Sequence, residues 1–215
     1  MTIVSIEQSL LKYDGQPITQ SILKDLLRDY LRPHNKVREL EKKNILTPVK
    51  RGLYIIGPSL SNRRPSVYVL ANHIYGPSYV SLEAALSYWG LIPEQVTTIA
   101  SMTTGSSKIF RTTVGLFEYT HQRLPYYSFG IRMVESATDQ TILIASPEKA
   151  LCDIIATKSG LLLRSVSQTR DFLTEDLRIE REALTQLDLS LIQSWLADAP
   201  KKSSLVMLLK TLEGL

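Results

Sequence analysis

The segment from Lys36 to Ile55 limits the possible folds of this chain more than any other segment. In its first half, Val37 and Leu40 stand three residues apart among basic side chains, which is the spacing of an amphipathic helix. Pro33 suits the first turn of that helix, because a backbone N–H at this position has no partner within the helix. The sequence therefore predicts a basic helix that buries one apolar stripe and exposes its charges.

Two short β-rich runs, residues 46–49 and 53–56, follow the basic helix. Lys50-Arg51-Gly52 separates them, and glycine adopts the positive φ that a tight hairpin turn requires. We therefore expect a two-stranded hairpin with a basic tip directly after the basic helix.

Two more helical patterns precede the basic helix. Apolar residues between Ile6 and Leu11 predict a short helix that ends near the turn pair Asp14-Gly15. Ile18-Thr19 is expected to open a second helix, with Thr19 as the N-cap and apolar positions from Ile22 to Leu27. Three helices followed by a hairpin are the order of a winged helix-turn-helix, in which one helix enters the DNA major groove.

We therefore expect a winged helix-turn-helix over residues 1–57, and the distribution of charge agrees with it. Residues 1–64 contain twelve Lys or Arg and six Asp or Glu, a net charge of +6, whereas residues 65–215 have a net charge of −2. This asymmetry indicates a polyanion as the partner of the first segment alone. A solvated basic surface is the alternative.

Seven side chains make up the expected DNA-binding set. Asn35 and Arg38 are assigned to base reading, because an Asn amide matches adenine and an Arg fork matches guanine. His34 is a weaker candidate for the same role. The other members carry the charge needed to hold phosphates, and Arg63 and Arg64 extend this contact from the linker. These other members are Lys36, Lys42, Lys43, Lys50 and Arg51.

These assignments have alternatives. Lys42 and Lys43 are also typical of a solvated helix face, and Lys50-Arg51 of an ordinary turn. Glu39 and Glu41 argue against phosphate contacts along the whole helix, because they can instead pair with Lys36 or Lys43 nearby.

A composition break rich in Gly, Pro, Ser and Asn follows the hairpin, and we place a linker at residues 58–65. Residues 66–215 are expected to form a mixed α/β domain that ends in a helical segment, so the fold class of the chain is α+β. The expected helices of its first part span 66–75 and 81–89, and a third begins at the N-cap Ser146. The expected strands are Gln95–Met102, Lys108–Thr120, Tyr126–Val134 and Thr141–Ala145, with a break at Thr138-Asp139. The helical candidates after Gly160 are Leu161–Leu173, Glu180–Leu187, Ser190–Leu196 and Ser203–Leu212.

Three phrases of the sequence carry a resemblance to a known family. The first is the helix end and wing, from Leu40 to Ile45 and then Arg51-Gly52-Leu53-Tyr54. The second runs from Tyr79 to Pro93, and the third is Ala145-Ser146-Pro147-Glu148-Lys149-Ala150-Leu151-Cys152-Asp153. In this order and spacing, over roughly residues 5–160, the chain resembles the AbiEi-type antitoxins of bacterial type IV toxin–antitoxin and phage-defence systems.

The resemblance implies a regulatory and protective function. Proteins of this family bind inverted repeats in the double-stranded DNA of their own promoter and repress their own operon. Their second domain counters a nucleotidyltransferase toxin, typically without forming a stable complex with it. The resemblance transfers no catalytic residue. The alternative is a winged-helix regulator whose second domain senses a small ligand.

Enzymatic readings find little support in the sequence. The three histidines lack ligand spacing, and there is no phosphate-binding glycine motif, so we expect neither a metal nor a cofactor. Ser81 and Ser146 are expected to be helix caps rather than nucleophiles, and Cys152 a buried, inert thiol. Glu148, Lys149 and Asp153 are the polar residues of the second domain that could line a functional surface, although a role in stabilising their helix is favoured. An enzyme acting on nucleic acid or on the toxin is left as a third possibility.

The sequence also bears on the compartment. It has no run of 18 apolar residues and no secretory signal at its N-terminus, and its single cysteine excludes a disulfide framework. We expect a cytoplasmic protein without a membrane span.

Overall fold

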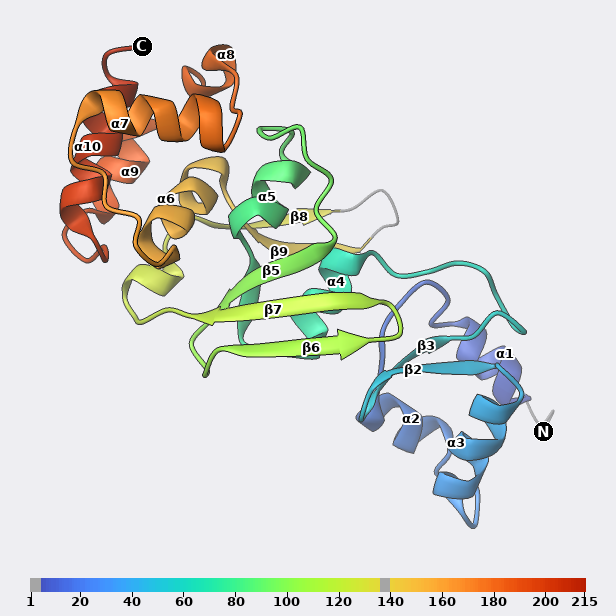
Figure 1. The fold of residues 1–215 in the computed structure, drawn as a ribbon. Coiled ribbons are helices and arrows are strands. Elements are labelled where there is room, and N and C mark those ends of the chain that lie inside the picture. The colour runs from blue at the N-terminus through green and yellow to red at the C-terminus, as the bar shows by residue number, and fades with distance from the viewer. Residues whose placement is uncertain (1–4, 136–139) are drawn as a thin grey trace.

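The computed structural model describes residues 5–135 and 140–215 and has an α+β architecture (Figure 1). One sheet has three strands in the order β1-β3-β2, and the other has six in the order β6-β7-β5-β4-β9-β8. The break expected at Thr138-Asp139 lies outside the described residues, as do the first four residues of the segment 1–57.

The N-terminal segment forms three helices and the small sheet. Its elements are α1 (Ile6–Leu11), β1 (Ile18–Thr19), α2 (Gln20–Leu26), α3 (Pro33–Lys42), β2 (Leu46–Lys50) and β3 (Leu53–Ile56). The three helices and one face of the sheet enclose a small core that includes Leu10, Leu23 and Leu40. The second helix begins at Gln20, directly after Thr19, but Ile18-Thr19 also pair with Tyr54 and Leu53 as a short strand that the sequence did not predict. The expected cap is correct, since the Thr19 hydroxyl accepts a bond from the Ile22 N–H at 3.4 Å.

The hairpin of β2 and β3 is buried on both faces. Gly52 closes its turn with a φ of +82°, as expected for a tight hairpin. One face carries Leu46 and Ile56 toward the three helices. The opposite face carries Val49, Leu53 and Ile55 into the larger hydrophobic core that residues 66–215 build. The small sheet is therefore a middle layer between the N-terminal helices and the rest of the chain.

The six-stranded sheet and its helices follow the linker. Its elements are α4 (Val67–Ile74), β4 (Ser78–Val80), α5 (Leu82–Tyr88), β5 (Thr98–Thr103), β6 (Lys108–Thr112), β7 (Gly115–His121), β8 (Ile131–Glu135), β9 (Thr141–Ala145) and α6 (Pro147–Thr157). Strand pairing is mixed, with β4-β9 and β5-β7 parallel. Tyr119 donates to Ala71 of α4 on one face, and Tyr79 donates to Asp153 of α6 on the other. Helices thus cover both faces of the sheet (Figure 1).

Two strand expectations are wrong in this part. The run Lys108–Thr120 is not one strand but the antiparallel hairpin β6-β7. Its turn residues Thr113 and Val114 are β-branched, so the turn resembles strand sequence. The run Tyr126–Val134 begins with a 3-10 turn at Tyr126–Ser128, and only β8 is extended.

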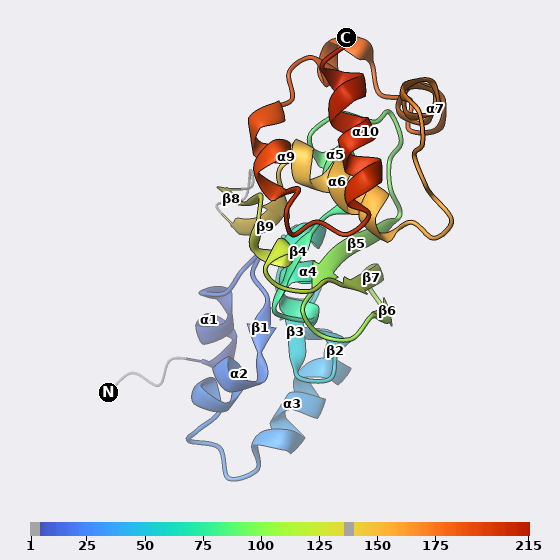
Figure 2. The same cartoon turned by 90° about the vertical axis from the view of Figure 1, so that its left-hand side faces the viewer.

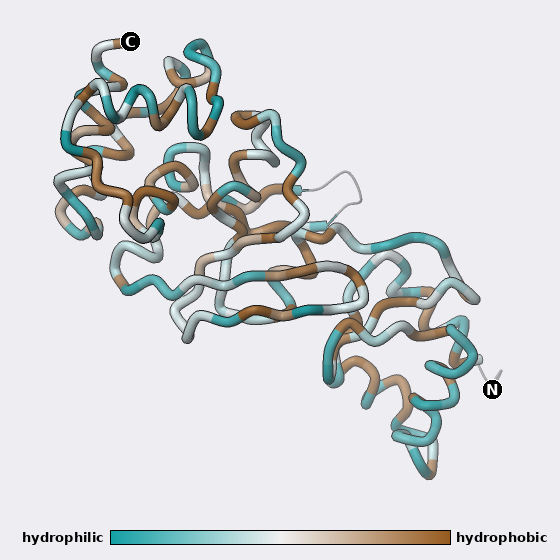
Figure 3. The backbone as a smooth tube through the Cα atoms, in the orientation of Figure 1, coloured by the Kyte–Doolittle hydropathy of each residue, from teal (hydrophilic) through white to brown (hydrophobic). Residues whose placement is uncertain are grey.

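The C-terminal part is helical, as expected. It consists of α7 (Val166–Asp171), a π-helical turn (Phe172–Asp176), α8 (Arg181–Leu184), α9 (Leu189–Trp195) and α10 (Lys202–Leu212). The first of these begins five residues later than expected, where the Ser165 hydroxyl accepts a bond from the Gln168 N–H at 3.1 Å. Of these helices, α9 and α10 lie beside α6, and α7 packs against α10 (Figure 2). Hydrophobic residues concentrate along the strands and inner helix turns, whereas α3 is largely hydrophilic (Figure 3).

A fully buried ion pair lies at the centre of the larger part. Lys149 Nζ is 3.0 Å from Asp153 Oδ1, and both side chains have no solvent exposure. The other carboxylate oxygen of Asp153 accepts bonds from the hydroxyls of Tyr79 at 3.0 Å and Ser81 at 2.7 Å. Lys149 Nζ also donates to the Tyr126 carbonyl at 2.9 Å. Burial raises the pKa of Asp153 and lowers the pKa of Lys149, because both charges leave water.

The hydrogen bonds of the second and third sequence motifs (Tyr79 to Pro93 and Ala145 to Asp153) show which of their polar side chains cap a helix. Ser81 is not a side-chain cap, since its hydroxyl donates to Asp153. Ser146 is the expected cap and accepts a bond from the Lys149 N–H at 3.2 Å. Glu148 is buried and accepts bonds from the Ser146 hydroxyl and the Asp188 N–H. These polar groups therefore hold α6 in place and face no solvent.

We predict that Lys149→Met lowers the free energy of unfolding by about 3–5 kcal/mol, because Asp153 is left as a buried charge without its partner. The double variant Lys149→Met/Asp153→Asn should lose less than the sum of the two single variants, since its amide oxygen still accepts from Tyr79 and Ser81. Urea unfolding of the four proteins measures this coupling. Additive losses would show that the two charges do not stabilise each other.

Candidate nucleic-acid interface

The helix α3 exposes a polar stripe opposite its buried side. Successive residues turn by about 100°, so Asn35, Arg38 and Lys42 share one side of the helix while Leu40 points the other way. Leu40 is 1% exposed and packs in the small core. The three polar residues are all exposed, as the sequence predicts.

The three exposed side chains are free to bind another molecule. Within residues 5–135 and 140–215, none of Asn35, Arg38 and Lys42 forms a side-chain hydrogen bond or an ion pair. An Asn amide and an Arg fork in this state keep the donors and acceptors that base edges require.

Lys36 and Lys43, in contrast, each form an ion pair with Glu39. Glu39 is 3.0 Å from Lys36 Nζ and 2.8 Å from Lys43 Nζ. The hydrogen bonds from Lys43 and Lys36 lower the pKa of Glu39, and the bond to Glu39 raises the pKa of Lys43. Lys36 also lies over the Tyr30 ring, 5.6 Å from its centroid. The pairing of Glu39 that the sequence left as an alternative is therefore confirmed.

The hairpin tip places its two basic residues in different surroundings. Arg51 is exposed and, within the described chain, has no side-chain partner. Lys50 is half-buried, and its Nζ lies 5.6 Å from the centroid of Phe110 on β6. Thr113, at the turn after β6, donates to the Pro48 carbonyl at 3.0 Å. The β6-β7 hairpin therefore supports the tip from the side.

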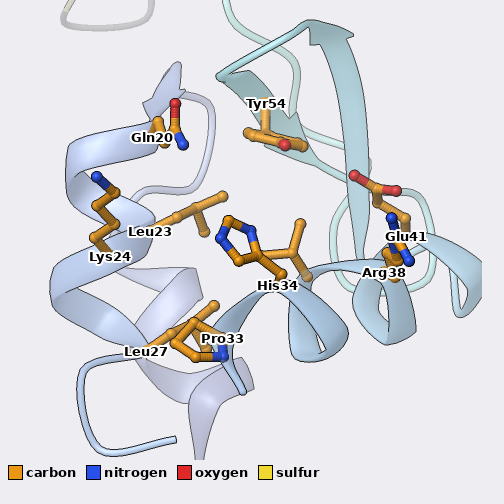
Figure 4. A pocket seen from close by; sticks show the side chains of 10 residues that line it. Gln20, Leu23, Lys24, Leu27, Pro33, His34, Arg38, Glu41 and Tyr54 are labelled. Carbon is orange, nitrogen blue, oxygen red and sulfur yellow. The ribbon is translucent and has the colours of Figure 1, made fainter. Parts of the chain in front are cut away.

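The hairpin tip and α3 both lie next to α2. The Gln20 N–H, at the start of α2, donates to the Gly52 carbonyl at 2.8 Å. Gln20 and Arg38 line the same hollow between α2 and α3 (Figure 4). The hairpin tip and α3 therefore both adjoin α2, which bonds to the tip at Gly52 and lines the hollow together with α3.

The hollow brings two residues that the sequence did not single out next to two that it did. Gln20 and Lys24 come from α2, whereas Tyr54 of β3 belongs to the wing motif and His34 of α3 is the weaker base-reading candidate (Figure 4). Burial and the charge of Glu41 raise the pKa of Tyr54. Neither helical periodicity nor charge distinguishes Lys24 from other surface lysines. Its position at the hollow follows only from the packing of α2 beside α3.

Both linker arginines contact other parts of the chain. The Arg64 guanidinium donates to the Ile56 carbonyl at 2.6 Å and fixes the end of the linker to β3. The Arg63 side chain runs past Gly15, where a Cβ would lie 2.9 Å from Arg63 Nε. Gln140 donates to the Gly15 carbonyl and accepts from the Ser66 N–H, which joins this loop to α4.

Other kinds of site were sought in the same residues. Among the described residues, no group of three or more His, Cys, Asp or Glu side chains is placed to hold a metal ion. Cys152 is buried as expected, and burial raises the pKa of its thiol. Within this part of the chain, no helix has the length and apolar character needed to cross a membrane.

Comparison with known proteins bears on the fold. The chain matches no protein-family model and no curated protein sequence. It is similar to the solved structure of the RV2827C protein from Mycobacterium tuberculosis, with a TM-score of 0.65 and 13% sequence identity. The match covers 96% of this chain and 75% of that chain. A match of this extent at this identity shows a shared fold.

Proposed function

We propose that this chain is a DNA-binding antitoxin of a type IV toxin–antitoxin system. Residues 1–57 form a winged helix-turn-helix that binds inverted repeats in its own promoter and represses transcription. Residues 66–215, joined through the linker 58–65, form the domain that counters a nucleotidyltransferase toxin in the cytoplasm without a stable complex. The chain acts by binding and not as an enzyme.

The order of the elements supports the winged helix. The segment runs α1, β1, α2, α3, β2, β3, and the short first strand pairs with the last one. In a winged helix-turn-helix the third helix is the one that enters the major groove, and the hairpin after it is the wing. In this proposal α3 is the recognition helix and the β2-β3 hairpin is the wing.

The observation that supports the proposal is that, among the described residues, exposed polar side chains without a partner occur on α3 and at the hairpin tip, two elements that both adjoin α2. Asn35, Arg38 and Lys42 are exposed along α3, and Arg51 is exposed at the hairpin tip. Gln20 connects the two elements through its bond to Gly52. In this proposal Asn35 and Arg38 read bases, while Lys42 and Arg51 hold phosphates. Lys36, Lys43 and Lys50 play smaller parts, because each already has a partner.

The antitoxin part rests on the second and third phrases of the resemblance. Ser81 belongs to one phrase and Asp153 to the other, and their side chains are 2.7 Å apart. Both residues are fully buried, so the phrases describe the packing of α5 against α6. They support a common architecture with the family and give no sign of a catalytic group.

We predict that Arg38→Ala weakens binding of promoter DNA by about 1–3 kcal/mol and relaxes specificity at one base, because it removes a base contact. Lys36→Ala on the same helix is the matched control, since Glu39 already engages Lys36, and it should have a smaller effect. Fluorescence anisotropy with labelled promoter DNA and with a scrambled duplex measures both. Equal loss in the two variants would contradict the assignment of Arg38.

We also predict that binding falls steeply with salt, because bound Lys and Arg release counterions from DNA. Lys42→Ala should reduce the slope of log K against log salt concentration by about 1, while its effect should be similar on cognate and scrambled duplexes. A slope unchanged in Lys42→Ala would remove this residue from the phosphate contacts.

Neutralisation of the toxin should be separable from DNA binding. We expect the full-length variant Arg38→Ala/Arg51→Ala to lose repression of a promoter reporter and still restore growth when co-expressed with the neighbouring toxin gene. Full-length protein is used because Val49, Leu53 and Ile55 contact the larger core. Wild-type protein that binds its promoter but does not restore growth would contradict the antitoxin proposal and favour a regulator that senses a ligand.

A further inference from the structure

Two stretches of the chain are nearly free of acidic residues. Between Glu41 and Glu83 the sequence contains neither Asp nor Glu, and between residues 98 and 125 it contains only Glu118. The first stretch forms the β2-β3 hairpin, α4 and β4, and the second forms β5 and the β6-β7 hairpin. These elements pack against one another in the structure. A surface built from them therefore has few carboxylates that would repel an anion.

The edge strand β6 connects the β2-β3 hairpin to this surface. Lys50 of the hairpin lies over the Phe110 ring of β6. The centroid of the Phe110 ring is 5.7 Å from that of Tyr75, which directly follows α4. Lys108 Nζ, at the start of β6, lies 4.8 Å from the centroid of Tyr75. Two lysines, one from each part of the chain, therefore flank a pair of neighbouring rings beside the hairpin (Figure 1).

The one carboxylate of the second stretch points away from these lysines. Successive side chains of a strand point to opposite faces of the sheet, so Lys108 and Phe110 share one face of β6. Glu118 of β7 pairs with Ile109 and therefore lies on the other face, together with Arg111. The face that carries Lys108 has no acidic residue on either strand of the β6-β7 hairpin.

The cations of this face keep their charge. Within residues 5–135 and 140–215, neither Arg51 nor Lys50 nor Lys108 forms an ion pair. An aromatic ring attracts an ammonium group and fixes its position, but unlike a carboxylate it does not neutralise it. Arg51 and Lys108 are exposed. His121 Nδ1 lies 2.8 Å from the Gly105 carbonyl, which holds the loop before Lys108 against β7.

We propose that Arg51, Lys50 and Lys108 form a cation row that holds the phosphate backbone of duplex DNA next to the groove that α3 enters. A DNA strand carries one phosphate about every 3.4 Å along the helix axis, so a row of cations without carboxylates complements it. Such contacts position the protein on the duplex and carry no sequence information. The inference rests on the proposed function, because the row begins at the hairpin tip. It adds a DNA contact from the larger part of the chain.

Two variants of β6 in the full-length protein separate a contact on one face from an effect of net charge. We expect Lys108→Gln to reduce the slope of log K against log salt concentration by about 1, on promoter and scrambled duplexes alike. Arg111→Gln removes the same charge from the opposite face of the same strand and should leave the slope near that of wild type. Lys210→Gln on α10 is the remote control. Circular dichroism confirms that each variant is folded.

Uncharged phosphate analogues locate the contact on the DNA. Methylphosphonates are placed at one position of the promoter duplex at a time, and the positions that weaken binding of wild type are recorded. At least one of them should have no effect on Lys108→Gln and keep its effect on Arg111→Gln. This position should differ from those that become silent in Lys42→Ala, because Lys42 lies on α3 and not on β6.

Two results would overturn the cation row and leave the proposed function standing. One is an equal change of slope in Lys108→Gln and Arg111→Gln, which would show that only net charge matters. The other is a wild-type protein that binds the promoter but has no methylphosphonate position that depends on Lys108. Wild-type protein that binds no duplex DNA at all would contradict the proposed function and the cation row together.

Discussion

The double-sided burial of the β2-β3 hairpin is the constraint on which the rest of the structure depends. One face closes the small core of α1, α2 and α3, and the other contributes Val49, Leu53 and Ile55 to the core of the larger part. Separating the parts would expose these side chains to water, at a cost of about 1.5–3 kcal/mol for each one fully exposed. The orientation of α3 relative to the six-stranded sheet is therefore set by packing and not only by the linker.

The same arrangement determines how the candidate interface is displayed. The tip stands beside the start of α2, where the Gln20 N–H donates to the Gly52 carbonyl, and the β6-β7 hairpin of the larger sheet packs against its other side. Lys50 turns back onto Phe110, which leaves Arg51 as the exposed cation of the tip. Along α3, Glu39 pairs with Lys36 and Lys43. The exposed polar side chains that have no partner among the described residues are then those of Asn35, Arg38 and Lys42, which share one side of the helix. The interface that remains is smaller than the seven residues expected from the sequence, and its members come from two elements.

Much of the fold could be predicted from local chemistry, and the failures have a physical cause. Pro33 and Ser146 mark helix starts because their preference depends on the backbone of one turn. The strand at Ile18-Thr19 cannot be predicted from its own residues, because a two-residue strand exists only through its partner β3. Ser81 has the chemistry of a cap, but a buried carboxylate 72 residues away competes for its hydroxyl. For the site, the sequence identifies Asn35, Arg38 and Lys42 correctly as exposed, since helical periodicity suffices. It cannot reveal the contact of Lys50 with Phe110 or the hollow beside Lys24, which depend on tertiary packing.

In the proposed function, the carboxylate of Glu39 would affect how the N-terminal segment finds its binding site among the other sequences of genomic DNA. By occupying two of the lysines on α3, it lowers the number of cations that attract any duplex regardless of sequence. In the proposed function, residence on random DNA would be short, because that residence is governed almost entirely by non-specific charge. The N-terminal segment would then leave wrong positions quickly and stay only where its Asn and Arg side chains find matching base edges.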